Sequence, residues 1–186
     1  MTVLASLWLP ILLSAVVVFI ASSILHTVFK YHHKEIHPIP EEDKVLAALR
    51  GVGLQRGLYV FPYCKGGKEM KSPEMIEKYK QGPVGTITVF PSGPPVMGKF
   101  LGLWFGYCLL VGFFVAYLAW HTLAVGTNYL VVFRVVGTAA FLAYGLGQLS
   151  NGIWKGQLWG TTIKEVVDGL VYGLLTAGTF GWLWPK

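Results

Sequence analysis

Long apolar stretches alternate with one polar stretch along this chain, and the apolar stretches predict membrane-spanning helices. From Met1 to Phe29 no side chain is charged, and the apolar sequence runs almost without a break. About 20 such residues allow a helix to cross the hydrocarbon core of a bilayer. A cleaved signal peptide would carry a basic segment before a shorter apolar one. We therefore predict a retained membrane helix, roughly from Val3 to His26.

Three further apolar stretches follow the polar one. The second stretch, Lys99–Trp120, is uninterrupted. In the third, Arg134 interrupts the apolar sequence Tyr129–Leu149. The part of this stretch without a charged residue lies between Arg134 and Lys155. The fourth starts near Glu165 and ends at Trp184. The pattern predicts a mainly α fold, a four-helix transmembrane bundle.

The segment 30–97 has a different character, with charges, prolines and turn residues. Helical patterns cover Pro40–Gly51 and Ser72–Gly82, where Ser72 is a typical N-cap residue. Strand-like patterns cover Gly57–Tyr63 and Pro83–Phe90. Two strands alone are marginal in water, so they must pack on the helices, the membrane or a partner. We predict a small α+β cap at 30–97, between a first membrane helix at 1–29 and the other three at 98–186.

Basic residues lie at the ends of the apolar stretches on one side of the predicted bundle. They flank the segment 30–97 and the link between the third and fourth stretches. They are Lys30, Lys34, Lys99, Lys155 and Lys164. The opposite ends carry only Arg134 and Lys186. Because Lys and Arg collect on the cytoplasmic side of membrane proteins, we expect the segment 30–97 in the cytoplasm and both termini outside.

Composition agrees with a membrane protein. Hydrophobic residues make up 54% of the 186 residues and charged residues 13%, whereas a soluble domain has about 25% charged residues. The formal net charge is +6. Since the basic residues are mixed with acidic ones and lie beside apolar stretches, they indicate contact with lipid headgroups and not with nucleic acid. Cys64 and Cys108 show no zinc-ligand spacing and are expected to be free thiols.

Small residues recur every fourth position in three of the apolar stretches. They are Gly98, Gly102 and Gly106 in the second stretch, Ala139, Ala143 and Gly147 in the third, and Gly169, Gly173, Ala177 and Gly181 in the fourth. Small side chains on one helix face let membrane helices approach closely. We therefore expect tight packing, either within the chain or against partners. Besides the bilayer, the expected partners are other membrane subunits or a second copy of the chain.

Charged residues inside apolar stretches are the first candidates for function, because charge in a membrane is costly. Arg134 lies in the third stretch, and Asp168 lies about one turn inside the fourth. In the simplest interpretation, Arg134 reaches out to water and Asp168 borders its helix start. The alternative is a small transporter or channel that uses Asp168 as part of a proton or ion path.

Histidines suggest a second kind of site. His33 and His37 have the i, i+4 spacing of metal ligands on a helix, although Pro38 weakens a helix there. His26 lies at the inner end of the first stretch with Ser22 one turn before it, an arrangement that leaves room for an axial haem or pigment ligand. These residues are the candidate cofactor ligands, and the sequence does not identify a cofactor.

Four segments resemble a family of small bacterial four-span membrane proteins. The segments are GLYVFPYC, KYKQGPVGTITV, VFRVVGTAAFLAYG and DGLVYGLLTAGTFGWLWP, at 57–64, 78–89, 132–145 and 168–185. The resemblance covers roughly half of the chain. It implies the four-span fold and a place in the bacterial inner membrane, and it implies no activity and no site residues.

No catalytic motif accompanies these patterns. The sequence contains no P-loop, no dinucleotide-binding glycine motif, no nucleophile elbow and no zinc-protease motif. The sequence therefore favours a non-enzymatic protein, an accessory or assembly subunit of a larger membrane complex. The alternatives are the transporter or channel that uses Asp168, and a haem, pigment or metal protein that uses His26 or the pair His33 and His37.

Overall fold

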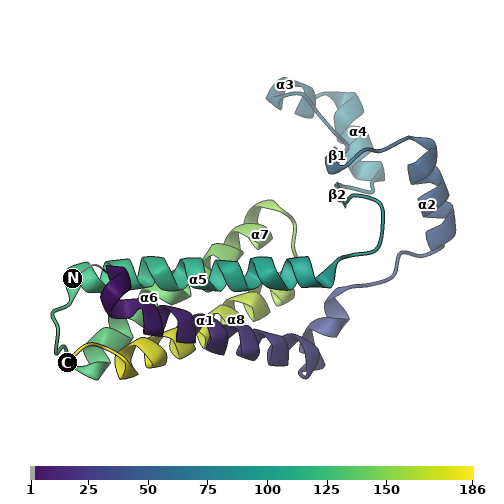
Figure 1. Ribbon diagram of the computed structural model, residues 1–186. Coiled ribbons are helices and arrows are strands. Elements are labelled where there is room, and N and C mark those ends of the chain that lie inside the picture. Colours follow the sequence, from purple (N-terminus) through teal and green to yellow (C-terminus); the bar gives the residue numbers. More distant parts are fainter. Residues whose placement is uncertain (1–2) are drawn as a thin grey trace. The chain divides into compact units, whose positions relative to one another are not determined.

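Two compact units make up the chain, and the fold is mainly helical with one small sheet (Figure 1). The computed structural model describes residues 3–186, except for the side chains at positions 3, 4, 30, 33 and 34. The first unit combines the residues up to Ile36 with Val96–Lys186, and the second is His37–Pro95. The first unit contains the long apolar helices.

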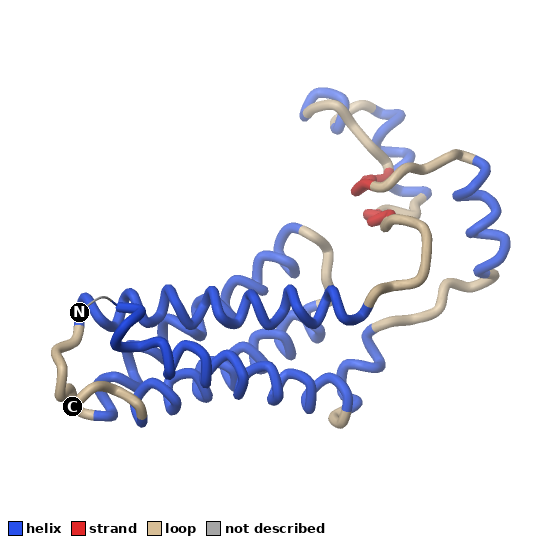
Figure 2. Tube along the Cα trace, viewed as in Figure 1, coloured by secondary structure: helices blue, strands red, loops and turns tan. Residues whose placement is uncertain are grey.

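Four helices of the first unit run side by side as a bundle (Figure 2). They are α1 (Val3–Thr27), α5 (Met97–Thr122), α6 (Tyr129–Tyr144) and α8 (Trp159–Trp182). Shorter elements are the 3-10 helices η1 (Lys30–Glu35) and η2 (Leu146–Gln148), and the helix α7 (Leu149–Trp154). The most extensive contact is between α6 and α8, and α1 packs against both α5 and α8.

The bundle buries a core and leaves apolar side chains on its outside. Phe180, Val18 and Val136 are fully buried between the helices. Ile20 and Phe114, on α1 and α5, are more than half exposed. Apolar side chains arranged along the outside of long helices suit a lipid environment, where the backbone polar groups are satisfied within each helix.

Within residues 3–186, three helical segments are long and apolar enough to cross a membrane: Ala5–Thr27, Met97–Thr122 and Tyr129–Trp154. The sequence predicts four such segments, and α8, the fourth, does not meet this measure. The first half of α8 carries Lys164, Glu165 and Asp168, which lowers its apolar content. Contacts with α6 and α1 bury much of α8 inside the bundle, so fewer of its residues have to suit lipid.

The small residues of α8 lie against α6. A Cβ atom added at Gly169 would lie 2.3 Å from the Cα atom of Gly145, and one added at Gly173 would lie 3.1 Å from the backbone nitrogen of Phe141. Ala177 is fully buried, and an added Cβ at Gly181 would lie 2.7 Å from the Tyr129 ring. Close backbone approach therefore holds the α6–α8 pair together.

The small residues of α5 have a different environment. A Cβ atom added at Gly98, Gly102 or Gly106 would find no atom of the described chain within 4 Å. The surroundings of these glycines, near the start of α5, are therefore open, whereas Ala116 and Ala119 in the last turns of the same helix are fully buried.

The second unit has the predicted order of helices and strands, with one short extra helix. Its elements are α2 (Glu42–Gly51), β1 (Gly57–Phe61), α3 (Gly67–Met70), α4 (Pro73–Gln81) and β2 (Gly85–Val89). The two strands pair antiparallel, with Gly57 opposite Val89. Ser72 caps α4, since its hydroxyl accepts a hydrogen bond of 3.2 Å from the Met75 backbone nitrogen. Among the residues described in α2, α3 and α4, only Met75 is buried.

Candidate metal centre

Polar side chains from three elements meet at one end of the bundle. His26 lies in the last turn of α1, and His32 lies on η1, which follows α1. Glu35 is the last residue of η1, and a 3-10 helix with three residues per turn places it on the same side as His32. Lys164 and Asp168 are four residues apart in the first turns of α8 and therefore share one face of that helix.

Asp168 lies at the centre of this cluster. Its side chain is 5% exposed. The carboxylate oxygen Oδ2 lies 2.8 Å from Nε2 of His32 and 3.9 Å from Nε2 of His26. The other oxygen, Oδ1, accepts a hydrogen bond from the Tyr31 hydroxyl. The two imidazole rings are stacked with their centroids 4.7 Å apart, so both present Nε2 to the same carboxylate.

The Nδ1 atoms of the two histidines face hydrogen-bond acceptors. His26 Nδ1 lies 3.0 Å from the backbone oxygen of Ser22, and His32 Nδ1 lies 2.9 Å from Oε2 of Glu35. A neutral histidine that donates from Nδ1 keeps a lone pair on Nε2. Each Nε2 lone pair would then face the Asp168 carboxylate, which is also an acceptor. Such an arrangement requires a cation, either an added proton on the ring or a metal ion between the groups.

The geometry fits a metal ion. One ligand atom each from His26, His32 and Asp168 lies within 4.8 Å of the other two. Imidazole and carboxylate are ligands that zinc and non-haem iron share, and three protein ligands leave a coordination position open. Hydrogen bonds that hold the outer nitrogen of each ligating histidine are typical of metal sites in proteins. Glu35 and the Ser22 carbonyl are placed to supply them.

The charge around this cluster also favours a cation. Lys164 Nζ lies 2.9 Å from Oε1 of Glu35 and donates a hydrogen bond of 2.8 Å to the backbone oxygen of Tyr31. Burial raises the pKa of Glu35, but the hydrogen bonds from Lys164 and His32 outweigh burial and hold that pKa below its usual range. Among the described side chains, and with neutral histidines, the carboxylates of Glu35, Glu165 and Asp168 carry three negative charges against one ammonium, that of Lys164. One divalent cation would neutralise the difference within this described set.

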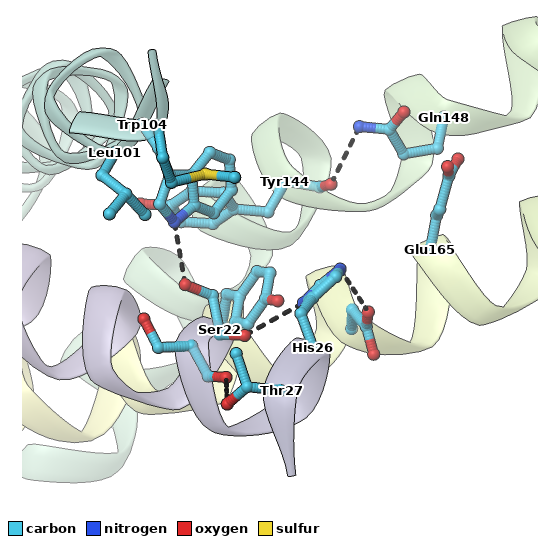
Figure 3. A pocket seen from close by; sticks show the side chains of 12 residues that line it. Ser22, His26, Thr27, Leu101, Trp104, Tyr144, Gln148 and Glu165 are labelled. Atoms are coloured by element: carbon cyan, nitrogen blue, oxygen red, sulfur yellow. Dashed lines mark hydrogen bonds and ion pairs between the residues drawn. The ribbon is translucent and has the colours of Figure 1, made fainter. Parts of the chain in front are cut away.

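A pocket of about 480 Å³ lies beside the cluster (Figure 3). It is lined by residues of α1, α5, α6, η2 and α8, among them His26 and Asp168. Figure 3 shows Ser22 between His26 and Trp104, and both rings are hydrogen-bonded to it, His26 to the backbone oxygen and Trp104 to Oγ. The Tyr172 hydroxyl and Oε2 of Glu165 are buried and have no hydrogen-bond partner among the described residues. The pocket therefore combines aromatic walls with polar atoms that lack partners.

The sequence pointed to His26 and Asp168 separately, and the structure brings them together. His37 lies beyond the end of η1, in the other unit, and the side chain of His33 lies outside the described residues. Because η1 is a 3-10 helix that ends at Glu35, it does not carry the i, i+4 pair on one α-helical face. Arg134 is exposed on α6, in the half that packs beside the end of α8, far along the bundle from Asp168.

Sequence reasoning assigned no part in a site to Tyr31, His32 or Lys164. Each of these residues is polar and close to the end of an apolar stretch, where charged residues are ordinary. The available signal was Asp168 itself, a carboxylate in a predicted membrane-spanning stretch without a basic residue in the same stretch. Such a residue requires a partner from another element, and the polar run from Lys30 to Glu35 was the nearest source.

Comparison of the chain with protein-family models, curated proteins and solved structures found no match.

Proposed function

We propose that this chain is an integral membrane protein that binds a divalent transition-metal ion at His26, His32 and Asp168. The observation that carries the proposal is the position of two Nε2 atoms and one carboxylate oxygen within 4.8 Å of one another, with both Nδ1 atoms held by acceptors. In the metal-bound form, Glu35 and the Ser22 carbonyl orient the two rings, and the Tyr31 hydroxyl orients Asp168.

The membrane part of the proposal extends to all four bundle helices. Three helical segments have the length and apolar character of membrane spans. The fourth helix, α8, packs along α6 and α1 over most of its length, which supports it as the central, shielded span of a four-helix bundle. Lys99, Lys155 and Lys164 favour the orientation with the segment 30–97 in the cytoplasm. The metal centre would then lie near the cytoplasmic surface of the membrane.

The donor set selects the class of metal. Two imidazoles and one carboxylate suit Zn²⁺, Fe²⁺ or Mn²⁺, whereas Ca²⁺ and Mg²⁺ prefer oxygen ligands alone. With three protein ligands, a tetrahedral ion keeps one position for water or another small ligand. The site therefore supports metal binding with an accessible coordination position.

Metal titration of the purified protein in lipid nanodiscs tests the proposal. We expect Zn²⁺ to bind in a ratio of about one per chain in competition with a chromogenic chelator. The variants His26→Gln, His32→Gln and Asp168→Asn should each weaken binding by at least about a hundredfold. His121→Gln is the matched control, since His121 is exposed on α5 and its Nδ1 is also bonded to a backbone oxygen, that of Tyr117. Binding that survives in all three variants, or that His121→Gln removes equally, would contradict the proposal.

The open face of α5 favours a second candidate function, the accessory or assembly subunit that the sequence suggested. Gly98, Gly102 and Gly106 have no neighbour within the described chain, and such a face suits a helix of another subunit or of a second copy. Native mass spectrometry from nanodiscs should show an assembly that Gly102→Leu dissociates. A lone chain in the wild-type protein would contradict this candidate.

A further inference from the structure

The pocket and the metal centre share two residues. His26 and Asp168 line the pocket and also supply two of the three ligand atoms, so the pocket gives access to the ion's open coordination position. Its volume of about 480 Å³ lies in the range of pockets that take small organic ligands, roughly 300–1,000 Å³. The inference that follows rests on the proposed metal site.

Two polar atoms in the pocket point to a ligand of defined chemistry. Tyr172 is 4% exposed, and its hydroxyl has no partner among the described residues. Oε2 of Glu165 is also buried without a described partner. Buried polar groups in proteins are almost always hydrogen-bonded, because an unpaired one is costly. The hydroxyl offers a donor and the carboxylate an acceptor, so the missing ligand should carry both an acceptor and a donor.

The rest of the lining is apolar and continues to the outside of the bundle. Trp104 and Tyr144 form aromatic walls, with ring centroids 6.3 Å apart. Met97 and Leu101 line the pocket from the first turns of α5, and both side chains are exposed. In a membrane these two side chains would contact lipid. An apolar chain is therefore able to run from the pocket towards the bilayer past Met97 and Leu101.

We propose that the pocket binds a single-chain amphiphile of the fatty-acyl class, with its head group on the metal ion. A carbonyl oxygen of the head would take the open coordination position and accept a hydrogen bond from Tyr172. An adjacent N–H or O–H group would donate to Glu165, and the alkyl chain would lie along Leu101 and Trp104. A fatty amide and a protonated fatty acid share this chemistry.

Hydroxamates test the inference, because their head combines a metal-ligating carbonyl with an N–H donor. The protein is loaded with Co²⁺ in phosphatidylcholine nanodiscs, and ligand binding is read from the visible spectrum of the ion. We expect octanohydroxamate to bind at least about tenfold more tightly than acetohydroxamate. Leu101→Trp should remove that advantage and change acetohydroxamate binding by less than about twofold, since the head site stays intact.

Two comparisons separate the pocket from general effects. Leu110→Trp is the matched control, because Leu110 is also exposed on α5 but lies outside this pocket. Partition of octanohydroxamate into the bilayer is the same for both variants and cancels in their ratio. Tyr172→Phe should keep the Co²⁺ affinity and weaken both hydroxamates by about fivefold, which corresponds to one lost hydrogen bond of about 1 kcal/mol.

The outcomes distinguish the two proposals. If Co²⁺ does not bind, the metal site and the amphiphile site are both wrong. If Co²⁺ binds and octanohydroxamate gains nothing over acetohydroxamate, or Leu101→Trp and Leu110→Trp behave alike, only the amphiphile site is wrong. If octanohydroxamate shows the expected advantage and only Leu101→Trp removes it, the same measurement with octanamide and octanoate decides which fatty-acyl head the site accepts.

Discussion

His32 and Asp168 are 136 residues apart in the chain, and Nε2 of the first lies 2.8 Å from Oδ2 of the second. This contact joins η1, which follows the first apolar helix, to a buried residue in the first half of α8. Lys164 strengthens the same junction, because it bonds both the Glu35 carboxylate and the Tyr31 backbone oxygen. A polar network therefore links η1 to α8 at this end of the bundle.

Removal of the Glu35 side chain should weaken metal binding without removing a ligand. Glu35 holds Nδ1 of His32 at 2.9 Å and thereby keeps Nε2 directed at Asp168. We expect Glu35→Ala to lower Zn²⁺ affinity by about 10- to 100-fold, as measured by chelator competition. Glu41→Ala is the control, because Glu41 is exposed and lies in the other unit. An affinity within about twofold of wild type in Glu35→Ala would show that Glu35 does not position His32.

Loss of the Tyr31 hydroxyl should destabilise the junction between η1 and α8. The hydroxyl donates to Oδ1 of Asp168, a buried carboxylate. Hydrogen bonds to charged groups contribute about 1.5–3 kcal/mol, so Tyr31→Phe should speed amide exchange across Lys30–Glu35 in the metal-free protein. Tyr117→Phe, with an exposed ring on α5, is the control. Unchanged exchange in Tyr31→Phe would mean that this hydrogen bond does not hold η1 in place.

A methyl group added at Gly169 should prevent the normal approach of α6 and α8. Its Cβ would lie 2.3 Å from the Gly145 Cα, and a backbone atom is unable to move aside cheaply. Overpacking of this kind costs about 1–3 kcal/mol or more, so Gly169→Ala should lower the thermal unfolding midpoint in detergent. Gly102→Ala meets open space and should leave the midpoint unchanged or raise it slightly. Equal midpoints in the two variants would contradict the described packing.

The helix cap at Ser72 offers a local test in the second unit. Its hydroxyl accepts a hydrogen bond from the Met75 backbone nitrogen. Ser72→Ala should cost about 1 kcal/mol of helix stability, seen as faster amide exchange in α4. Ser92→Ala, in an exposed loop, should have no such effect. If the amide exchange rates of α4 are the same in Ser72→Ala as in the wild-type protein, the cap does not stabilise α4.

Local patterns were sufficient for most helices and strands. The first apolar stretch predicts Val3 to His26, and α1 is observed at Val3–Thr27. The Ser72–Pro73 start of α4 and its end at Gly82 follow from side chains next to the helix itself. These features depend on neighbours in sequence, so a single sequence contains the necessary information.

Long-range contacts were not predictable in the same way. The start of α8 at Trp159 lies before the apolar stretch begins, and the first buried residue of α8, Thr162, lies against Gly152 of α7. The cluster of His26, His32 and Asp168 depends on η1 folding back on α8, which no periodic pattern in either segment indicates. His26 and Asp168 were recognisable as unusual residues, but the distance between them is a property of the packed bundle.

X-ray absorption spectroscopy of the Zn²⁺-loaded protein in nanodiscs measures the ligands of the ion itself. We expect imidazole nitrogen and carboxylate oxygen at about 2.0–2.2 Å, without sulfur, and a weaker imidazole signal in His32→Gln. Absence of bound zinc, sulfur ligation, or an imidazole signal that is the same in His32→Gln would contradict the proposed metal site.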